Sequence, residues 1–193
     1  MVSAAPPKRR DAPATRARIL DAAQRAFADL GYSQAGIREI AALAGTSTTL
    51  LIRYFGSKAG LFEAALGEAM RSDAIYAIDR SQLGAHFAEM FTRPEIEIRP
   101  PAMIALAASD PQAREITARV AEELAIRPLA RWLGGPDAHT RAVQIFMLST
   151  SFVLYTRQVP VMPVERGIDP AMTQWFARAV QEIVDGSPNA NSK

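Results

Sequence analysis

The segment from residue 46 to residue 58 carries hydroxyl, guanidinium and ammonium side chains at helical spacing. Thr48, Thr49 and Arg53 fall on the early and outer part of a predicted short helix. A helix that enters the major groove of DNA presents such positions to base edges. The guanidinium fork of Arg53 can donate to two acceptors of guanine, and the threonines offer a hydroxyl or a methyl group to any base. An ordinary solvated helix face has the same composition, so the pattern needs support from its surroundings.

The other polar residues of this segment suit backbone phosphates better than bases. Ser47, Tyr54 and Lys58 are expected as phosphate contacts. The ring of Tyr54 can equally pack under the helix with its hydroxyl near the surface. The basic run at residues 8–10 can reach into a minor groove as an arm, but most such tails only increase solubility, so it is left out of the predicted site.

Other chemistry lacks the necessary residues. The chain has no cysteine, and its two histidines, His86 and His139, lie in different predicted helices without a Cys or an acidic partner at metal-binding spacing. The acidic pairs at 95/97 and 122/123 do not place two carboxylates across a scissile bond. Nucleophile-elbow, phosphate-loop and dinucleotide motifs are missing from the sequence. We therefore expect no enzyme activity, no catalytic residues, no metal site and no cofactor.

The DNA-reading segment lies within a run of short helices. We expect helices at about residues 15–30, 36–44 and 47–55, and a long one from residue 58 onward. Gly31 ends the first as a left-handed cap, and Ser57 is placed to cap the fourth. In the second and third, Ala41 is small where two helices cross, Gly45 supplies a left-handed turn and Leu51 anchors the next helix from within. These features meet the steric demands of a helix-turn-helix.

A longer pattern extends through the first third of the chain. It consists of Thr15-Arg16-Ala17-Arg18-Ile19-Leu20-Asp21-Ala22-Ala23, Phe27, Gly31-Tyr32, Ile37-Arg38-Glu39-Ile40-Ala41, Ala44-Gly45 and Tyr54-Phe55-Gly56-Ser57-Lys58-Ala59-Gly60-Leu61-Phe62. In that order and spacing it resembles the DNA-binding domain of the TetR (tetracycline repressor) family of transcriptional regulators. The remainder is similar to the family's ligand domain in length, helix count and the segment at residues 127–137, Arg-Pro-Leu-Ala-Arg-Trp-Leu-Gly-Gly-Pro-Asp.

The resemblance implies a set of DNA contacts. It places a phosphate at the start of the second helix, near Arg38, and assigns a phosphate to Lys58. The chain departs from the family where Thr or Ser is common at Ala35 and Gly36, Val at Thr46 and Tyr at Ile52, which affects single contacts rather than the fold. The predicted DNA-binding residues are Arg38, Thr46, Ser47, Thr48, Thr49, Ile52, Arg53, Tyr54 and Lys58.

The rest of the chain, from residue 59 onward, is also predicted to be helical. Runs of alternating strand residues and internal repeats are not found, so we expect an all-α protein with about nine helices. Asp110-Pro111 and Gly135-Pro136-Asp137 are predicted helix starts with Asp as cap and Pro in the first turn. The predicted organisation is a flexible basic arm at 1–13, a three-helix DNA-binding domain at 14–58, a helical ligand-binding and dimerisation domain at 59–186 and a polar tail at 187–193.

Soft and aromatic residues of the body are candidates for a ligand cavity, although most such residues form plain core. They are Phe87, Met90, Phe91, Met103, Met147 and Phe152. Helices at about 138–158 and 169–185 carry apolar stripes, and the family pairs two such helices across a twofold axis. The predicted dimer residues are Met172, Trp175, Phe176, Ala179, Val180 and Ile183, although packing within one subunit accounts for part of each stripe.

Bulk properties agree with this assignment. Residues 1–60 hold 9 Lys or Arg against 4 Asp or Glu, whereas residues 61–193 hold 13 against 16, which gives a basic head on a mildly acidic body. The apolar run 145–155 is too short and too rich in hydroxyls to span a bilayer, and the amino terminus has no secretory pattern. We therefore expect the protein to be located in the cytoplasm.

The sequence thus predicts a homodimeric DNA-binding regulator. We expect a repressor that binds a near-palindromic operator in double-stranded DNA and is released by a small, largely apolar effector, with no membrane partner. By the resemblance, the fourth helix pivots as the cavity fills and changes the separation of the two DNA-binding heads. The alternative is a helical dimeric ligand-binding or scaffold module that has lost specific DNA binding, to which Ala35, Thr46 and Ile52 point.

Overall fold

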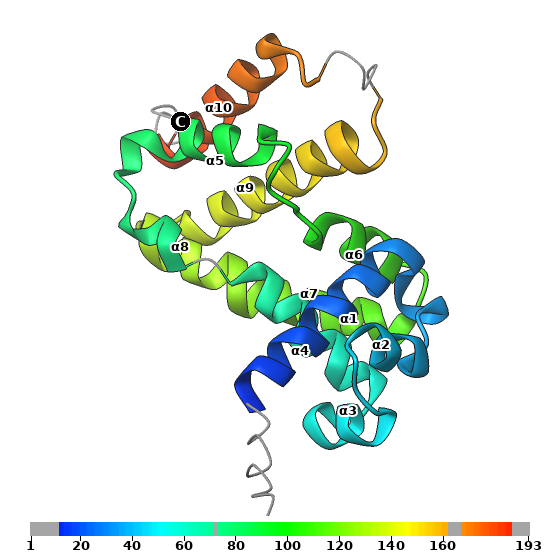
Figure 1. Cartoon of the computed structure of the whole chain (residues 1–193). Helices are drawn as coiled ribbons and strands as arrows, with labels where there is room; N and C mark the ends of the chain where they lie inside the picture. Colours follow the sequence, from blue (N-terminus) through cyan, green and yellow to red (C-terminus); the bar gives the residue numbers. More distant parts are fainter. Residues whose placement is uncertain (1–11, 72, 162–166, 187–193) are drawn as a thin grey trace, which may run out of the picture.

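A computed structural model describes residues 12–71, 73–161 and 167–186, and in this part of the chain every regular element is a helix. The α-helices are α1 (Ala12–Gln34), α2 (Ile37–Leu43), α3 (Thr48–Phe55), α4 (Lys58–Met70), α5 (Leu83–Thr92), α6 (Pro100–Ala107), α7 (Pro111–Ala121), α8 (Arg127–Leu133), α9 (Ala138–Val153) and α10 (Pro170–Asp185). Short 3₁₀ segments are η1 (Asp73–Ala77) and η2 (Arg80–Gln82), and π-helical segments are η3 (Glu122–Ile126) and η4 (Leu154–Gln158). Because η3 joins α7 to α8 without a break, the described residues form nine α-helical bodies in addition to the short segment η1. The all-α prediction is confirmed, and Figure 1 shows how the helices are arranged.

Local signals in the sequence set the ends of the first helices. Gly31 has φ 75° inside α1 and breaks it where a left-handed stop was predicted. Gly45, with φ 59°, makes the turn between α2 and α3. The hydroxyls of Ser47 and Ser57 accept hydrogen bonds from the backbone N–H of Leu50 and Gly60 and cap α3 and α4.

The second predicted helix start of the body is wrong in detail. Asp110 caps α7 as predicted, because its Oδ1 accepts a hydrogen bond from the Ala113 N–H at 3.0 Å. At the start of α9, Asp137 makes no capping bond, and its carboxylate instead accepts from Arg141 Nε at 3.1 Å. Pro136 therefore precedes the helix and is not in its first turn.

One apolar core holds the head of the molecule and joins it to the body. Phe27, Tyr32 and Phe62, from α1 and α4, pack edge to face or stacked with ring centroids 5.0 to 6.1 Å apart. The same cluster includes buried residues of α6 and α7, such as Met103 and Ile116. The core is thus continuous across the predicted domain boundary at residues 58 and 59, and α6 and α7 pack directly on α1 and α4.

A second core fills the other end, where Figure 1 shows α5, α8, α9 and α10 together. Phe152 of α9 and Phe176 of α10 stack with centroids 4.1 Å apart, and both are buried. Helix α10 approaches α5 so closely that a Cβ on Gly84 would lie 2.1 Å from the carbonyl oxygen of Ala177. Glycine is required there to allow the two backbones to touch.

Two further predictions concern the two ends of the chain and the crossing of a membrane. Residues 1–11, with the basic run 8–10, and residues 187–193 are outside the described residues. Within the described ranges, none of the helices combines the length and the apolar composition that crossing a bilayer would require.

Candidate DNA-binding face and ligand cavity

Helix α3 has one buried and one solvent-facing side. Leu51 is fully buried in the head core, as predicted for the anchor of this helix. Thr49, Ile52 and Arg53 are exposed on the opposite side, where spacings of three and four residues bring them together, and Thr48 is half-buried beside them. Figure 1 places α3 at the end of the molecule remote from α10. The helix therefore offers the predicted base-reading side chains at an exposed tip of the head.

A polar cleft lies beside this face. It has a volume of about 400 Å³ and is lined by Ala14, Thr15, Arg18, Ala42, Gly45, Thr46, Ser47 and Leu50. Two predicted residues, Thr46 and Ser47, thus meet Arg18 of α1, which sequence reasoning did not include. The available signal was weak, because Arg18 belongs to the matching pattern but lies about 28 positions before Thr46, and only the fold brings the two together.

The start of α2 differs from a bare anion site. The Gly36 N–H donates to Glu39 Oε2 at 3.3 Å, so a carboxylate of the chain itself already uses one donor at this end. Arg38, in the same turn, is exposed. A phosphate here would thus depend on Arg38 and on the other N–H groups of the turn.

Tyr54 and Lys58 point toward the protein. The Tyr54 hydroxyl donates to the Ala12 carbonyl at 3.4 Å, in keeping with the packing alternative for its ring. Lys58 Nζ donates to the Ser33 carbonyl at 3.1 Å and lies 4.9 Å from the centroid of the Tyr32 ring. An ammonium has three donors, so Lys58 keeps two for a phosphate while it fixes the turn between α1 and α2.

The head presents cations that are not neutralised. Among the described residues, Arg18, Arg38 and Arg53 form no ion pair with a carboxylate, whereas Arg25 of α1 is paired with Asp21 at 3.2 Å. Unpaired guanidinium groups on one end of the molecule favour a polyanionic partner, because binding costs them no existing ion pair. This agrees with the basic balance of residues 1–60.

The body contains a largely apolar cavity of about 350 Å³, at the lower end of the roughly 300–1,000 Å³ typical of small-molecule sites. It is lined by Gln24, Ala69, Met70, Arg71, Ile75, Tyr76, Phe87, Met90, Phe91, Ile96, Glu97, Ile98, Arg99, Pro100, Pro101, Ile104, Leu124, Ala125, Leu129, Ile145, Phe146, Ser149, Thr150 and Val153. Because Gln24 belongs to α1, the DNA-binding head itself forms part of the cavity wall.

Half of the predicted ligand residues line this cavity. Phe87 and Met90 do so together with Phe91. Met103 and Phe152 do not: Met103 packs in the first core, and Phe152 stacks on Phe176 in the second. Met147 also does not, since its side chain is 61% exposed on the outer side of α9. Helical periodicity identified apolar residues but could not separate core, cavity and surface.

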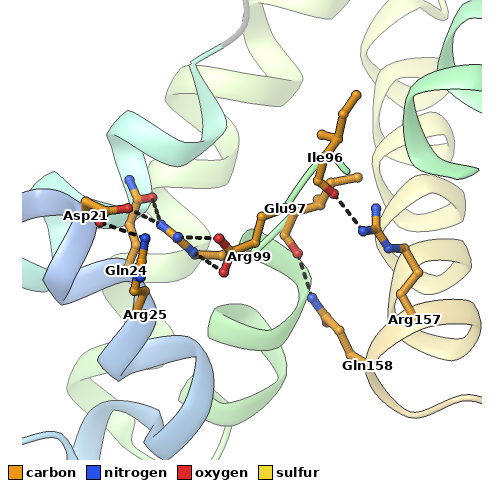
Figure 2. Close-up of polar contacts among 9 residues, drawn as sticks. Asp21, Gln24, Arg25, Ile96, Glu97, Arg99, Arg157 and Gln158 are labelled. Carbon is orange, nitrogen blue, oxygen red and sulfur yellow. Dashed lines mark hydrogen bonds and ion pairs between the residues drawn. The ribbon is translucent and has the colours of Figure 1, made fainter. Parts of the chain in front are cut away.

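Arg99 connects the cavity wall to α1 (Figure 2). Its Nη1 donates to Asp21 Oδ1 at 2.7 Å and to Gln24 Oε1 at 3.1 Å, while Nε and Nη2 donate to Glu97 at 2.8 and 2.5 Å. The hydrogen bond from Arg99 holds the pKa of Asp21, and likewise that of Glu97, below its usual range. We call this set Asp21, Gln24, Glu97 and Arg99 the α1 clasp.

The other side of the same segment is fixed to η4, which follows α9. Arg157 donates to the Ile96 carbonyl at 2.6 Å, and Gln158 donates to the Ile98 carbonyl at 2.8 Å (Figure 2). The segment between α5 and α6 is therefore held at both edges, by η4 and by α1. Sequence reasoning missed all of these residues because no local motif marks them.

The predicted dimer residues divide into two groups. Phe176 and Val180 are fully buried within the subunit, so their assignment to an interface is wrong, since α10 uses them to pack on α5 and α9. Trp175 is 45% exposed. Met172, Ala179 and Ile183 are half-buried beside these residues and stay candidates. On α9 and the segment that follows, Met147, Tyr155, Val159 and Val161 are also exposed.

Comparisons with known proteins agree with this architecture. A family model described as bacterial regulatory proteins, tetR family, matches residues 19–65, and one described as tetracyclin repressor-like, C-terminal domain, matches residues 81–184. A comparison with curated protein sequences finds no significant match.

Solved structures of similar proteins span nearly the whole chain. A TetR-family regulator from Streptomyces coelicolor A3 is 25% identical, with a TM-score of 0.53 over 94% of this chain and 100% of that one. A putative TetR-family transcriptional regulator from Rhodococcus sp. is 18% identical, with a TM-score of 0.68 over 90% and 97%. The regulator FadR from Bacillus subtilis, solved in complex with stearoyl-CoA, is 17% identical, with a TM-score of 0.64 over 89% and 98%.

A helix-turn-helix head joined to a cavity-bearing helical body defines a DNA-binding transcription regulator with a ligand-binding C-terminal domain. The chain belongs to the TetR family, whose matches cover both of these parts. Members of this family bind operator DNA as dimers, respond to small ligands and are generally not enzymes.

Proposed function

We propose that this protein is a cytoplasmic homodimeric repressor that binds a near-palindromic operator and is released by a small, largely apolar effector. The observation that carries the proposal is the outer face of α3, where Thr49, Ile52 and Arg53 are exposed while Leu51 is fully buried. Arg53 would read a guanine, and Thr48 and Thr49 would contact neighbouring bases. Arg38, Ser47 and Lys58 would position the helix on phosphates.

The cleft beside α3 supports one addition to the predicted contacts. Arg18 would join Thr46 and Ser47 at a phosphate, because all three line the cleft and Arg18 has no carboxylate partner in the described part of the chain. Exchange of Arg18 for Ala should then weaken binding to the operator and to random DNA by a similar factor, as expected for a contact that carries no sequence information.

A dimer would form through α9, η4 and α10. Met147 and Tyr155 are exposed eight residues apart, on one side of the rod that α9 and η4 form, and Trp175 is exposed on α10. Exposed apolar side chains of this size on two adjacent helices are typical of an interface. Two copies would place the recognition helices about 34–36 Å apart, one turn of DNA.

The effector would occupy the cavity between α4, α5, α6 and α9. Its wall is mostly aliphatic and aromatic, with Phe87, Phe91 and Ile145 among its residues. Filling the cavity would press on Gln24 of α1 and on the segment that leads into α6, and so change the separation of the two heads. Allosteric couplings of about 1–3 kcal/mol are typical, equivalent to roughly 5- to 150-fold weaker DNA binding.

The test is a binding titration with purified protein on a DNA site selected from random sequences. The proposal expects dimer binding that is much tighter on the selected site than on random DNA, with an affinity that falls steeply as salt rises. Equal affinity for both DNAs would refute specific operator recognition. A monomer at the concentrations that bind DNA would refute the dimer.

A further inference from the structure

The cavity wall contains charged side chains of both signs. Two guanidinium groups, Arg71 and Arg99, line the cavity together with a single carboxylate, Glu97. Arg71 pairs with Glu68 at 3.4 Å, and both of these side chains are about half exposed. Arg99 is likewise paired, with Asp21 and Glu97, so an anionic ligand gains from this wall only by taking over one of these existing pairs.

Arg99 is the most enclosed of these charges. Its side chain is 11% exposed, whereas that of its partner Glu97 is 64% exposed. Four of the five N–H groups that a guanidinium offers are used by the α1 clasp, and the second hydrogen of Nη2 has no acceptor among the described residues. Arg99, a residue of the cavity wall, thus keeps one N–H group that is not yet used.

The position of Glu97 makes it replaceable. Glu97 lies in the segment between α5 and α6, outside any helix, with most of its side chain in water. A second carboxylate at the same edge of Arg99 restores both charge-assisted hydrogen bonds while Glu97 turns to solvent, so the exchange leaves no buried charge unpaired.

A hydroxyl on the opposite helix gives a second polar contact. Ser149 of α9 is one of the residues of the cavity wall, and its Oγ is buried and has no hydrogen-bond partner within the described ranges. A buried hydroxyl without a partner is unfavourable, and a ligand oxygen would satisfy it. The apolar residues of the wall, such as Phe87 and Ile145, leave room for a hydrocarbon body.

We infer that the effector is a small amphiphilic carboxylate whose head group binds Arg99 in place of Glu97 and whose apolar body fills the cavity. This inference rests on the proposed ligand-responsive function and names its ligand class. Because Nη1 of Arg99 also donates to Asp21 and Gln24 of α1, the head group acts on one of the contacts between the body and the DNA-binding head.

The experiment compares ligands that differ only in the head group. Octanoate, octanol and octylamine, and hydrocinnamate with its alcohol and amine, are titrated into the full-length protein at pH 7 by calorimetry. Octanoate and hydrocinnamate should bind at least about 10-fold more tightly than the corresponding alcohols, which is the gain expected from a charge-assisted hydrogen bond. The amines should bind most weakly. Equal affinity of acid and alcohol, or preference for the amines, overturns the inference.

Variants separate the head-group contact from a general structural role. Arg99→Gln should reduce the affinity for octanoate to that for octanol and leave the affinity for octanol unchanged. Glu97→Gln should increase the affinity for octanoate, because it removes the carboxylate that competes for Arg99. Arg93→Gln is the matched control, because Arg93 is in the same segment but pairs with Glu89 on the surface. An Arg99→Gln protein that weakens acid and alcohol equally shows a structural role and refutes the assignment.

Operator binding distinguishes this inference from the proposed function. Octanoate should weaken operator binding by the wild-type protein at concentrations about 10-fold lower than those that affect Arg99→Gln, because the variant loses the head-group contact but keeps the cavity. If the ligand-free protein binds its operator but the carboxylates have no advantage, only the ligand class is wrong. If carboxylates bind with the expected preference but operator DNA is not bound, the proposed function fails and the ligand assignment stands.

Discussion

Exchange of Arg53 for Ala tests how α3 reads DNA. Arg53 is exposed and has no carboxylate partner in the described residues, so its loss removes no internal contact and should change the stability of the subunit by less than about 0.5 kcal/mol. If its guanidinium bonds a guanine edge, the variant should lose about 1–3 kcal/mol per half-site, or about 5- to 150-fold in affinity. The effect on random DNA should be smaller.

Fluorescence anisotropy with a labelled operator measures this difference. Wild-type and variant proteins are titrated with the preferred site, with sites changed at one base position at a time, and with random DNA at fixed salt. Arg53→Ala should relax the choice of base at one position of each half-site. Arg25→Ala is the control, because Arg25 is a cation of the same head that is already paired with Asp21.

One outcome would contradict the assignment. If Arg53→Ala weakened operator and random DNA by the same factor, Arg53 would be a phosphate contact. Base readout would then have to come from Thr48, Thr49 or Ile52, and single exchanges at those positions would identify which of them alters the preferred sequence.

Three further predictions concern salt, assembly and pH. Lys58→Ala should weaken all DNA about equally and reduce the salt slope by about 0.9 per subunit, measured from binding isotherms at several salt concentrations; a change in base preference would contradict this. Trp175→Glu should give a folded monomer by light scattering and circular dichroism, whereas Phe176→Glu should unfold the subunit because it buries a charge; a folded dimer of Trp175→Glu would exclude that interface. Asp21→Asn should destabilise the protein by up to about 1 kcal/mol at neutral pH. Because the hydrogen bond from Arg99 lowers the pKa of Asp21, that stabilisation is present above the unfolded pKa of about 3.9 and is lost as the pH falls further through the folded value, so denaturation of variant and wild type should converge in acid.

Local signals explain why the head could be predicted closely. Gly31, Gly45 and Ser57 act through their own backbone or through neighbours three residues away, and each does in the structure what its residue type implies. Leu51 and the exposed face of α3 follow in turn from helical periodicity. Contacts between residues so close in the sequence can be predicted from a short stretch of the chain alone.

The ligand site depends on contacts that no short stretch of the chain contains. Arg99 meets Asp21 and Gln24, which precede it by more than seventy positions, and the sequence gives no sign of the pairing. Phe152 and Met147 belong to the same apolar helix, yet one is core and the other surface, because the packing of α8 and α10 decides which side of α9 is covered. The pattern of apolar residues predicts which side chains are buried in general. Only the tertiary arrangement decides which of them form the core and which line the cavity.

Selection of bound sequences from random DNA by the full-length protein tests the central claim most directly. We expect an enriched, near-palindromic site that is bound by one dimer. Its half-sites should lie one helical turn, about 10–10.5 base pairs, or a multiple of it apart. Recovery of DNA with no common motif, while the protein remains a folded dimer, would contradict operator recognition and favour a dimeric ligand-binding module that does not read DNA.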